Sequence, residues 1–181
     1  MISLVTLHLL PTGYRPIADP VSNYAVSHYG FLYTSQTICS AVCGICLINL
    51  LLNSPVRVPI SAITALGVYS ASRLVIFAFP TDIKPPRTAR GTVHVILAVL
   101  TFAGIAVAAG VATPHLINNV TWSSVGTELR WSTYLIDGAA ILLAVVFAFR
   151  PLKQISGLVE RLIYLGTLSW FGFLLGGALL S

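Results

Sequence analysis

Charged residues are scarce in this sequence. Only 8% of its 181 residues are Asp, Glu, Lys or Arg, whereas 56% are hydrophobic, and the mean hydropathy is +0.90. A water-soluble domain carries about 25% charged residues. The shortage therefore excludes an ordinary soluble fold and indicates a chain whose surroundings are largely lipid.

The sequence also lacks a run of basic residues and a close pair of histidines, and each absence excludes a class of function. The net charge is +5, but the basic residues are spread along the chain rather than gathered in a run, so we expect no nucleic-acid binding. No two histidines have the H-x3-H spacing of a metal site, so we expect no metal. The residue pattern identifies no cofactor.

The cysteines are few and lie close together, at Cys39, Cys43 and Cys46. An odd number inside one apolar block excludes a disulfide framework. On a helix these positions share one face. We therefore expect small side chains that line a helix–helix contact, rather than ligands of an iron–sulfur cluster, which would need a loop around it.

Five apolar blocks are long enough to cross a bilayer. A hydrocarbon core about 30 Å thick needs roughly 20 apolar residues in a helix, because backbone groups in lipid must bond within their own segment. The sequence thus predicts an all-α, polytopic integral membrane helical bundle, forming a single membrane domain over 1–181. The expected spans are approximately 31–53, 58–80, 91–113, 131–149 and 161–180.

Residues 1–30 precede the first span, and we expect an irregular interfacial segment there, with one short helix near Pro20 to Ser27. Small residues in two of the spans predict close helix packing. These are Gly104 and Gly110 in the third span, and Gly172 and Gly176 in the fifth.

Three ionisable residues gather around the turn between the second and third spans. Arg73 lies near the end of the second span, Asp82 follows it, and His94 opens the third. A charge at membrane depth costs at least about 2 kcal/mol. Arg73 is therefore expected either to snorkel to the interface or to face inward and meet a carboxylate, with Asp82 within reach. Connectivity places all three at one face of the membrane.

The candidate binding residues are Arg73, Asp82, His94, His8, Asp19 and Thr88. Two of them are also candidate catalytic residues, because histidine titrates near neutrality and a carboxylate can orient it for acid/base work. These are His94 and Asp82. A structural Arg–Asp–His network that ties three elements together explains the same residues, so both interpretations stay open.

Asp137 is a separate ionisable residue, seven residues into the fourth span. In lipid a carboxyl group must face inward, be protonated or find a donor. We interpret it either as a packing hydrogen bond to a neighbouring helix or as part of a proton or substrate path.

Several ordered motifs over residues 8–94 resemble one family. They are HLLPTGYRPIADPVSNYAVSHYG (8–30), Arg73, FPTD (79–82) and T-x2-G-x2-H (88–94), with a weaker GLVERL at 157–162. In these motifs the sequence is similar to the bacterial and archaeal membrane family of domain of unknown function 998. The resemblance implies an integral membrane bundle with no established activity, and it supplies no catalytic residues.

The resemblance also implies a six-helix fold, in which MISLVTL would be the tail of a shortened first helix. It implies motif loops on the outer side of the membrane. The expected location is the cell membrane, as a multi-pass protein of a prokaryotic plasma membrane.

The sequence favours a multi-pass protein whose one-sided polar cluster binds a polar headgroup or small solute. Such a protein would be a transporter-like, sensor or accessory subunit. The alternatives are an intramembrane, hydrolase-like enzyme that modifies lipids, and a structural scaffold subunit. Expected partners are membrane lipids, a headgroup or small polar ligand, and a membrane protein or second copy of the chain.

The charge pattern predicts the orientation of the polar face. Seven basic residues fall on its side (Arg15, Lys84, Arg87, Arg90, Arg150, Lys153 and Arg161) and two on the other (Arg57 and Arg130). Because basic residues favour the cytoplasm, a Thr81→Cys variant should react with an impermeant thiol reagent only after the membrane is opened. Labelling in intact cells would instead place the motif outside, as the family resemblance implies.

Overall fold

Helices make up the regular structure of the chain. The computed structural model describes the backbone of residues 2–180 and the side chains of residues 5–149 and 151–179. The helices are α1 (Ile2–Leu9), η1 (Val21–Val26), α2 (Gly30–Leu52), α3 (Ile60–Val75), η2 (Ile76–Ala78), α4 (Ala89–Leu116), α5 (Val120–Ser123), α6 (Gly126–Ala148), η3 (Arg150–Ile155) and α7 (Ser156–Leu180), where η marks a 3₁₀-helix.

Five of these segments are long and apolar enough to cross a membrane, which confirms the predicted all-α bundle. They are Gly30–Leu52, Ile60–Ala78, Ala89–Leu116, Gly126–Ala148 and Pro151–Leu179. The last two begin earlier than predicted. The fourth starts in a polar stretch that suits a helix start, because Glu128 lies in its first turn, where an acid favours the helix dipole. The fifth starts earlier because η3 runs directly into α7.

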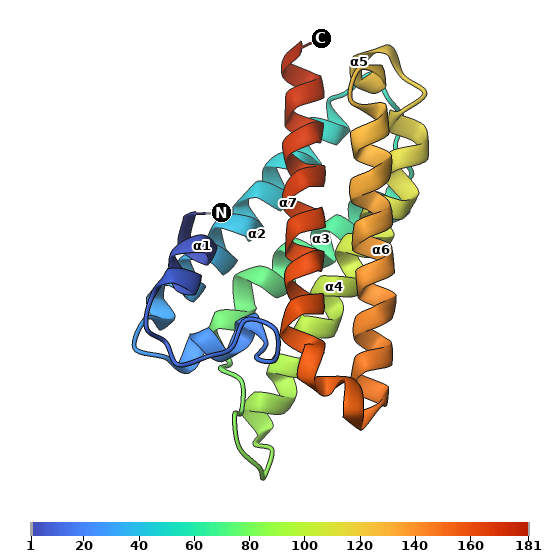
Figure 1. Ribbon diagram of the computed structural model, residues 1–181. Coiled ribbons are helices and arrows are strands. Elements are labelled where there is room, and N and C mark those ends of the chain that lie inside the picture. The colour runs from blue at the N-terminus through green and yellow to red at the C-terminus, as the bar shows by residue number, and fades with distance from the viewer. Residues whose placement is uncertain (1, 181) are drawn as a thin grey trace.

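The long helices pack in a simple order. α3 lies between α2 and α4, α4 also contacts α6, and α6 packs along the length of α7 (Figure 1). The shorter α1 packs on α2, and α5 packs on α7 near the carboxyl terminus. In the same view α6 and α7 stand upright, whereas α2 leans away from them.

Polar side chains join three of the long helices inside the apolar core. The hydroxyls of Thr113 on α4 and Thr133 on α6 lie 2.8 Å apart. Trp170 on α7 donates its indole N–H to Thr113 Oγ1 at 2.9 Å. Such bonds hold helices together in lipid, where apolar burial gives little preference for one neighbour over another.

Residues 10–29 form a strap that links α1 to α2 along the lower part of α7 in Figure 1. The short helix expected near Pro20 to Ser27 is present as η1. The start of the chain differs from the predicted irregular segment, because residues 2–9 are helical and the side chain of Leu7 is fully buried.

The prediction that the cysteines line a helix–helix contact is wrong. Cys39, Cys43 and Cys46 are free and exposed. α2 turns a different face to its neighbours, one that includes Ala41 and Gly44. The i, i+4, i+7 spacing correctly predicted a shared face, but the long apolar block left open which face is buried.

Glycine allows α3 and α4 to approach closely at Gly104. A Cβ added there would lie 2.9 Å from the carbonyl oxygen of Ala65 and 3.0 Å from the amide nitrogen of Tyr69. The predicted packing role of Gly172 and Gly176 is not found among the described residues, because a Cβ added at either would meet nothing within 4 Å.

A Gly104→Ala variant should lose stability, because the new methyl group would push against backbone atoms that cannot rotate away. We expect a loss of about 1–3 kcal/mol, measured as a lower unfolding midpoint in detergent. Gly67→Ala on α3 is the matched control, since an added Cβ there meets nothing within 4 Å and alanine favours a helix by about 1 kcal/mol over glycine. Equal effects of the two substitutions would contradict the close approach.

Candidate functional site

Arg73 faces inward, and its side chain is only 1% exposed. Its Nε donates to Ser40 Oγ at 2.9 Å, its Nη1 to the hydroxyl of Tyr164 at 3.1 Å, and its Nη2 to Gln36 Oε1. The guanidinium carbon lies 5.2 Å from the centroid of the Tyr164 ring, within cation–π range. Neutral groups on α2 and α7 thus accept the hydrogen bonds of Arg73, in place of the expected carboxylate of Asp82.

Asp82 and Thr88 instead build the start of α4. The Asp82 carboxylate accepts the amide N–H of Thr88 at 2.7 Å and its hydroxyl at 2.9 Å. Thr88 Oγ1 in turn accepts the N–H of Gly91 at 3.0 Å, which satisfies an otherwise unpaired donor at the helix terminus. The FPTD and T-x2-G motifs therefore join into one helix cap.

His94 is buried on α4, and its two ring nitrogens have different surroundings. Nδ1 lies 2.6 Å from the carbonyl oxygen of Phe79. Because a carbonyl only accepts, Nδ1 must carry the proton, and Nε2 of a neutral ring is then an acceptor. Nε2 is buried without a hydrogen-bond partner among the described residues.

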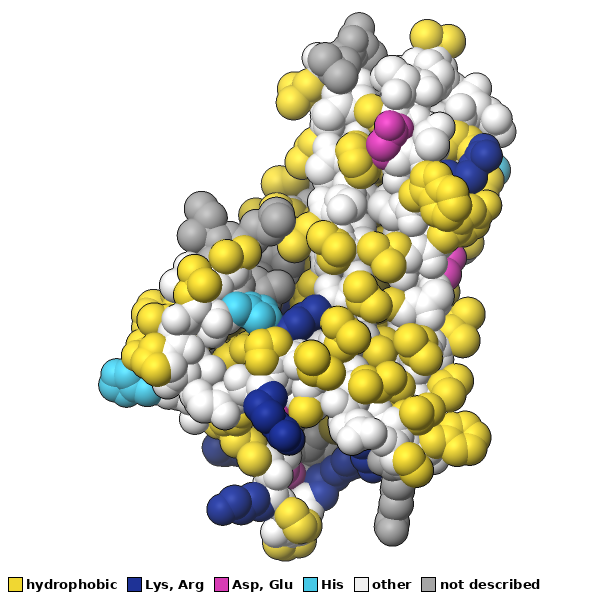
Figure 2. Space-filling model, viewed as in Figure 1, with side chains coloured by type: hydrophobic (Ala, Val, Ile, Leu, Met, Phe, Trp, Pro, Cys, Tyr) yellow, Lys and Arg dark blue, Asp and Glu magenta, His cyan; other side chains and the backbone are white. Residues whose placement is uncertain are grey.

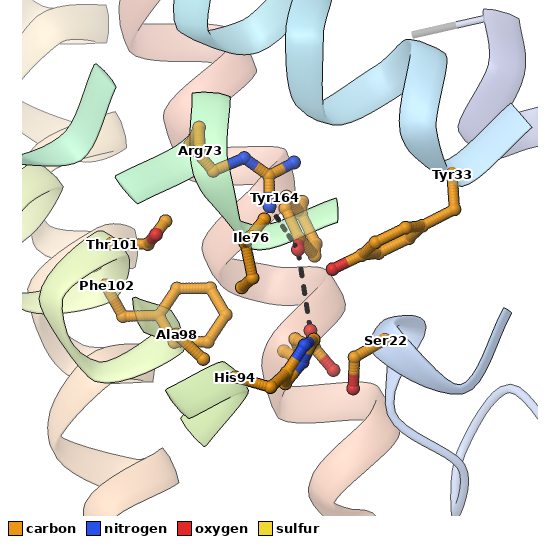
Figure 3. Close-up of a pocket in the computed structure, with 10 residues that line it drawn as sticks. Ser22, Tyr33, Arg73, Ile76, His94, Ala98, Thr101, Phe102 and Tyr164 are labelled. Atoms are coloured by element: carbon orange, nitrogen blue, oxygen red, sulfur yellow. Dashed lines mark hydrogen bonds between the residues drawn. The ribbon is translucent and has the colours of Figure 1, made fainter. Parts of the chain in front are cut away.

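Arg73 and His94 meet at one small internal cavity. Its walls also include Ser22, Tyr33, Ile76, Ala98, Thr101, Phe102, Glu160 and Tyr164 (Figure 3). The cavity has a free volume of about 10 Å³, which is room for about one water molecule. The hydroxyl of Thr101 is a second buried polar atom without a partner in the described part of the chain.

Glu160 connects this cavity to the strap. Its Oε2 accepts the amide N–H of Val21 at 2.7 Å, and its Oε1 lies 3.5 Å from the hydroxyl of Tyr164. Tyr164 therefore stands between Arg73 and Glu160, accepting from Arg73 and donating to Glu160. Figure 3 shows the bond between Arg73 and Tyr164. This chain of contacts ties α3, α7 and the strap together.

Arg161 clamps the strap to α7. Its Nη1 donates to the carbonyl oxygens of Asp19 at 2.9 Å and Gly157 at 2.8 Å, and its Nη2 donates to the hydroxyl of Tyr24 at 3.2 Å. Its Nε donates to His8 Nε2. The strap also runs so close to Gly157 that an added Cβ would lie 2.8 Å from backbone atoms of both Asp19 and Pro16.

The carboxylate of Asp19 works within the strap itself, where it accepts the amide N–H of Arg15 at 2.7 Å. Burial raises the pKa of the nearby Tyr14 hydroxyl, and the negative charge of Asp19 raises it further. The ring of Tyr14 packs edge-on against Tyr24, with centroids 5.6 Å apart.

The predicted binding residues therefore fall into three places. Arg73 and His94 share the cavity, His8 and Asp19 meet at the Arg161 clamp, and Asp82 with Thr88 forms the cap. Sequence reasoning missed the polar side chains that surround Arg73. These side chains are Gln36, Ser40 and Tyr164. Only for Glu160 and Arg161 was a signal available, since GLVERL puts two charged residues at the start of an apolar block.

A family model described as protein of unknown function (DUF998) matches residues 1–176, nearly the whole chain. The chain belongs to the DUF998 family. The match extends the resemblance seen over residues 8–94 to the clamp on α7. No curated protein and no solved structure matches the chain.

Removing the clamp should loosen the strap of this DUF998 protein. Arg161→Gln loses charged hydrogen bonds to Asp19, His8 and Tyr24, each worth about 1.5–3 kcal/mol. We expect amide hydrogen exchange over residues 10–29 to accelerate at least about tenfold, with the long helices unchanged.

Arg57→Gln, at an exposed position between α2 and α3, is the control for loss of a basic side chain and should leave exchange in the strap unaltered. Unchanged exchange in Arg161→Gln would mean that other contacts hold the strap.

Proposed function

We propose that this multi-pass protein resides in a prokaryotic plasma membrane and binds a small anionic group, free or as part of a lipid headgroup, in the Arg73–His94 cavity. It would act without chemistry, as a transporter-like, sensor or accessory subunit. The observation that carries the proposal is a fully buried cation beside two buried, unpartnered polar atoms, His94 Nε2 and Thr101 Oγ1.

The charge around the cavity supports an anion. Arg73 and Arg161 lie on either side of Glu160, whose oxygens bond the strap and Tyr164. Even with Glu160 ionised, these three residues leave one positive charge in excess. Further basic side chains lie exposed at the same end of the molecule, where Figure 2 shows most of the Lys and Arg (Arg15, Lys84, Arg87, Arg90 and Lys153).

The hydrogen-bonding pattern supports a ligand that also carries a proton. His94 Nε2 can only accept while the ring is neutral, so its partner must donate. Arg73 has five N–H groups, of which the bonds to Ser40, Tyr164 and Gln36 use three. A phosphate monoester or hydrogen phosphate offers both an acidic O–H and acceptor oxygens.

The size of the cavity sets a condition on binding. Room for about one water molecule is too little for a phosphate group, so the ligand enters only when a wall moves. The strap supplies the movable wall, because Ser22 lines the cavity and lies in the strap between the Glu160 and Arg161 contacts.

One observation favours the enzyme as a second candidate. The Phe79 carbonyl fixes the tautomer of His94 and leaves Nε2 as a free base beside the hydroxyls of Ser22 and Thr101. In this alternative His94 takes up a substrate proton, as a general base does. Phe79 then replaces Asp82 as the group that orients the ring.

The binding test compares ligands and variants on purified protein in detergent. Thermal unfolding should shift upward with inorganic phosphate or with phosphatidic acid, but not with phosphatidylcholine. A shift with phosphatidic acid alone identifies the lipid as the source. His94→Ala should abolish the shift, and Thr101→Val, which keeps the shape, should weaken binding about fivefold through one lost hydrogen bond.

Asp82→Asn is the discriminating variant, because Asp82 lies in the cap and not in the cavity wall. It should lower stability yet leave the ligand-induced shift intact. Loss of the shift in Asp82→Asn, with no effect of Thr101→Val, would move the site to the cap. No shift with any ligand would favour the scaffold role. Consumption of a lipid ester that stops in His94→Ala would favour the enzyme.

A further inference from the structure

Asp137 presents a carboxyl group on the membrane-facing side of the bundle. It lies midway along α6, its side chain is half-buried, and a Cβ added at Gly110 of α4 would lie 3.4 Å from its Oδ2. None of the hydrogen bonds among the described residues reaches this carboxyl group. An unsatisfied polar group at that depth costs several kcal/mol, so its partner should come from outside the chain.

The surroundings of Asp137 leave room for a helix to approach. Gly138 beside it is exposed, and a Cβ added there would meet nothing within 4 Å. Gly110 on the other side also lacks a side chain. Glycines at a membrane-facing surface let the backbones of two helices come close, and here they border the Asp137 carboxyl group.

Large exposed side chains lie on the same side of α6 as Gly138. Trp131 is 68% exposed, Tyr134 57% and Ile141 68%. Residues 131, 134, 138 and 141 recur at helical spacing and so form one outward stripe, and Asp137 stands at its edge toward α4. The stripe is therefore an exposed face of α6 with a carboxyl group along one edge.

We propose that a second copy of this chain docks on this face, with its own Asp137 meeting the first across a two-fold axis. A two-fold interface brings the same patch of both copies together, so the patch must be complementary to itself. A protonated carboxyl group meets that condition, because it holds one O–H donor and one acceptor oxygen. Two of them form a pair of reciprocal hydrogen bonds.

Charge placement favours carboxyl pairing over an ion pair between copies. The exposed Lys and Arg side chains of the described residues lie in loops or near helix ends, not at the depth of Asp137 (Arg15, Arg57, Lys84, Arg87, Arg90, Arg130 and Lys153). The exposed His115 lies in the last turn of α4, and His28 lies in the strap. A copy of the chain aligned in the same membrane thus offers no cation to this position. What it offers at the same depth is its own Asp137.

The interface is separate from the ligand cavity. It uses the outward face of α4 and α6 around Asp137, whereas the cavity lies inside the bundle and no residue of α6 lines it. The pairing therefore does not depend on the proposed ligand, and either can fail alone.

The oligomeric state in detergent tests the proposal. Wild-type protein should be a dimer by light scattering at micromolar concentration. Asp137→Asn keeps a donor and an acceptor in the same shape and should stay dimeric. Asp137→Leu should raise the concentration at half-dissociation about tenfold, because two hydrogen bonds between helices are lost. A monomeric wild type, or a Leu variant that dimerises as well as wild type, would overturn the proposal.

Cross-linking locates the contact independently of Asp137. In a background with Cys39, Cys43 and Cys46 replaced by serine, Gly138→Cys should give a disulfide-linked dimer on mild oxidation, since paired cysteines need Cα atoms within about 7 Å. Val42→Cys is the control, because Val42 is 50% exposed on α2, away from the proposed contact. Equal cross-linking at both positions, or at Val42→Cys alone, would rule out this face.

Discussion

The hydrogen bonding of the buried Arg73 guanidinium is the interaction on which the arrangement of the cavity and the strap depends. A cation inside an apolar bundle is costly unless hydrogen bonds and compensating charge surround it. Here α2 supplies Ser40 and Gln36, and α7 supplies Tyr164, which leads on to Glu160. Helices α2, α3 and α7 are therefore tied together by the need to satisfy one side chain.

The strap extends the same network outward. Glu160 ends the series of hydrogen bonds that runs from Arg73 through Tyr164. Its other carboxylate oxygen accepts the N–H of Val21, the first residue of η1. Arg161, the next residue along, grips the strap through Asp19 and Tyr24. The adjacent residues Glu160 and Arg161 on α7 thus have different roles. Glu160 is linked through Tyr164 to the buried charge of Arg73, and Arg161 binds the strap.

Sequence alone predicted the architecture well and the site only in part. Long apolar blocks define spans because the bilayer fixes their length. Each of the five predicted spans corresponds to a long apolar helical segment among the described residues. A uniformly apolar block does not show which face of its helix packs inward. The cysteines of α2 were therefore predicted at a helix contact, although they are exposed. Arg73 and His94 were recognisable as ionisable residues inside apolar segments.

The partners of those two residues were not recognisable. Gln36, Ser40 and Tyr164 are common residue types in helices, and only the tertiary packing of α2 and α7 against α3 makes them acceptors. Asp82 looked like a partner for Arg73 because it is close along the chain. Asp82 instead bonds Thr88, which is closer along the chain than Arg73 and lies at the start of α4.

The cap at Asp82 and Thr88 also divides the segment between η2 and α4 into two parts. It closes a short ring of chain, so Phe79 on one side and His94 on the other are fixed relative to each other. Residues 83–87 form the loop that these bonds close, and all of them are exposed. This excursion can therefore change in length and composition across evolution while the imidazole keeps its orientation, which makes it a natural position for an inserted tag or reporter.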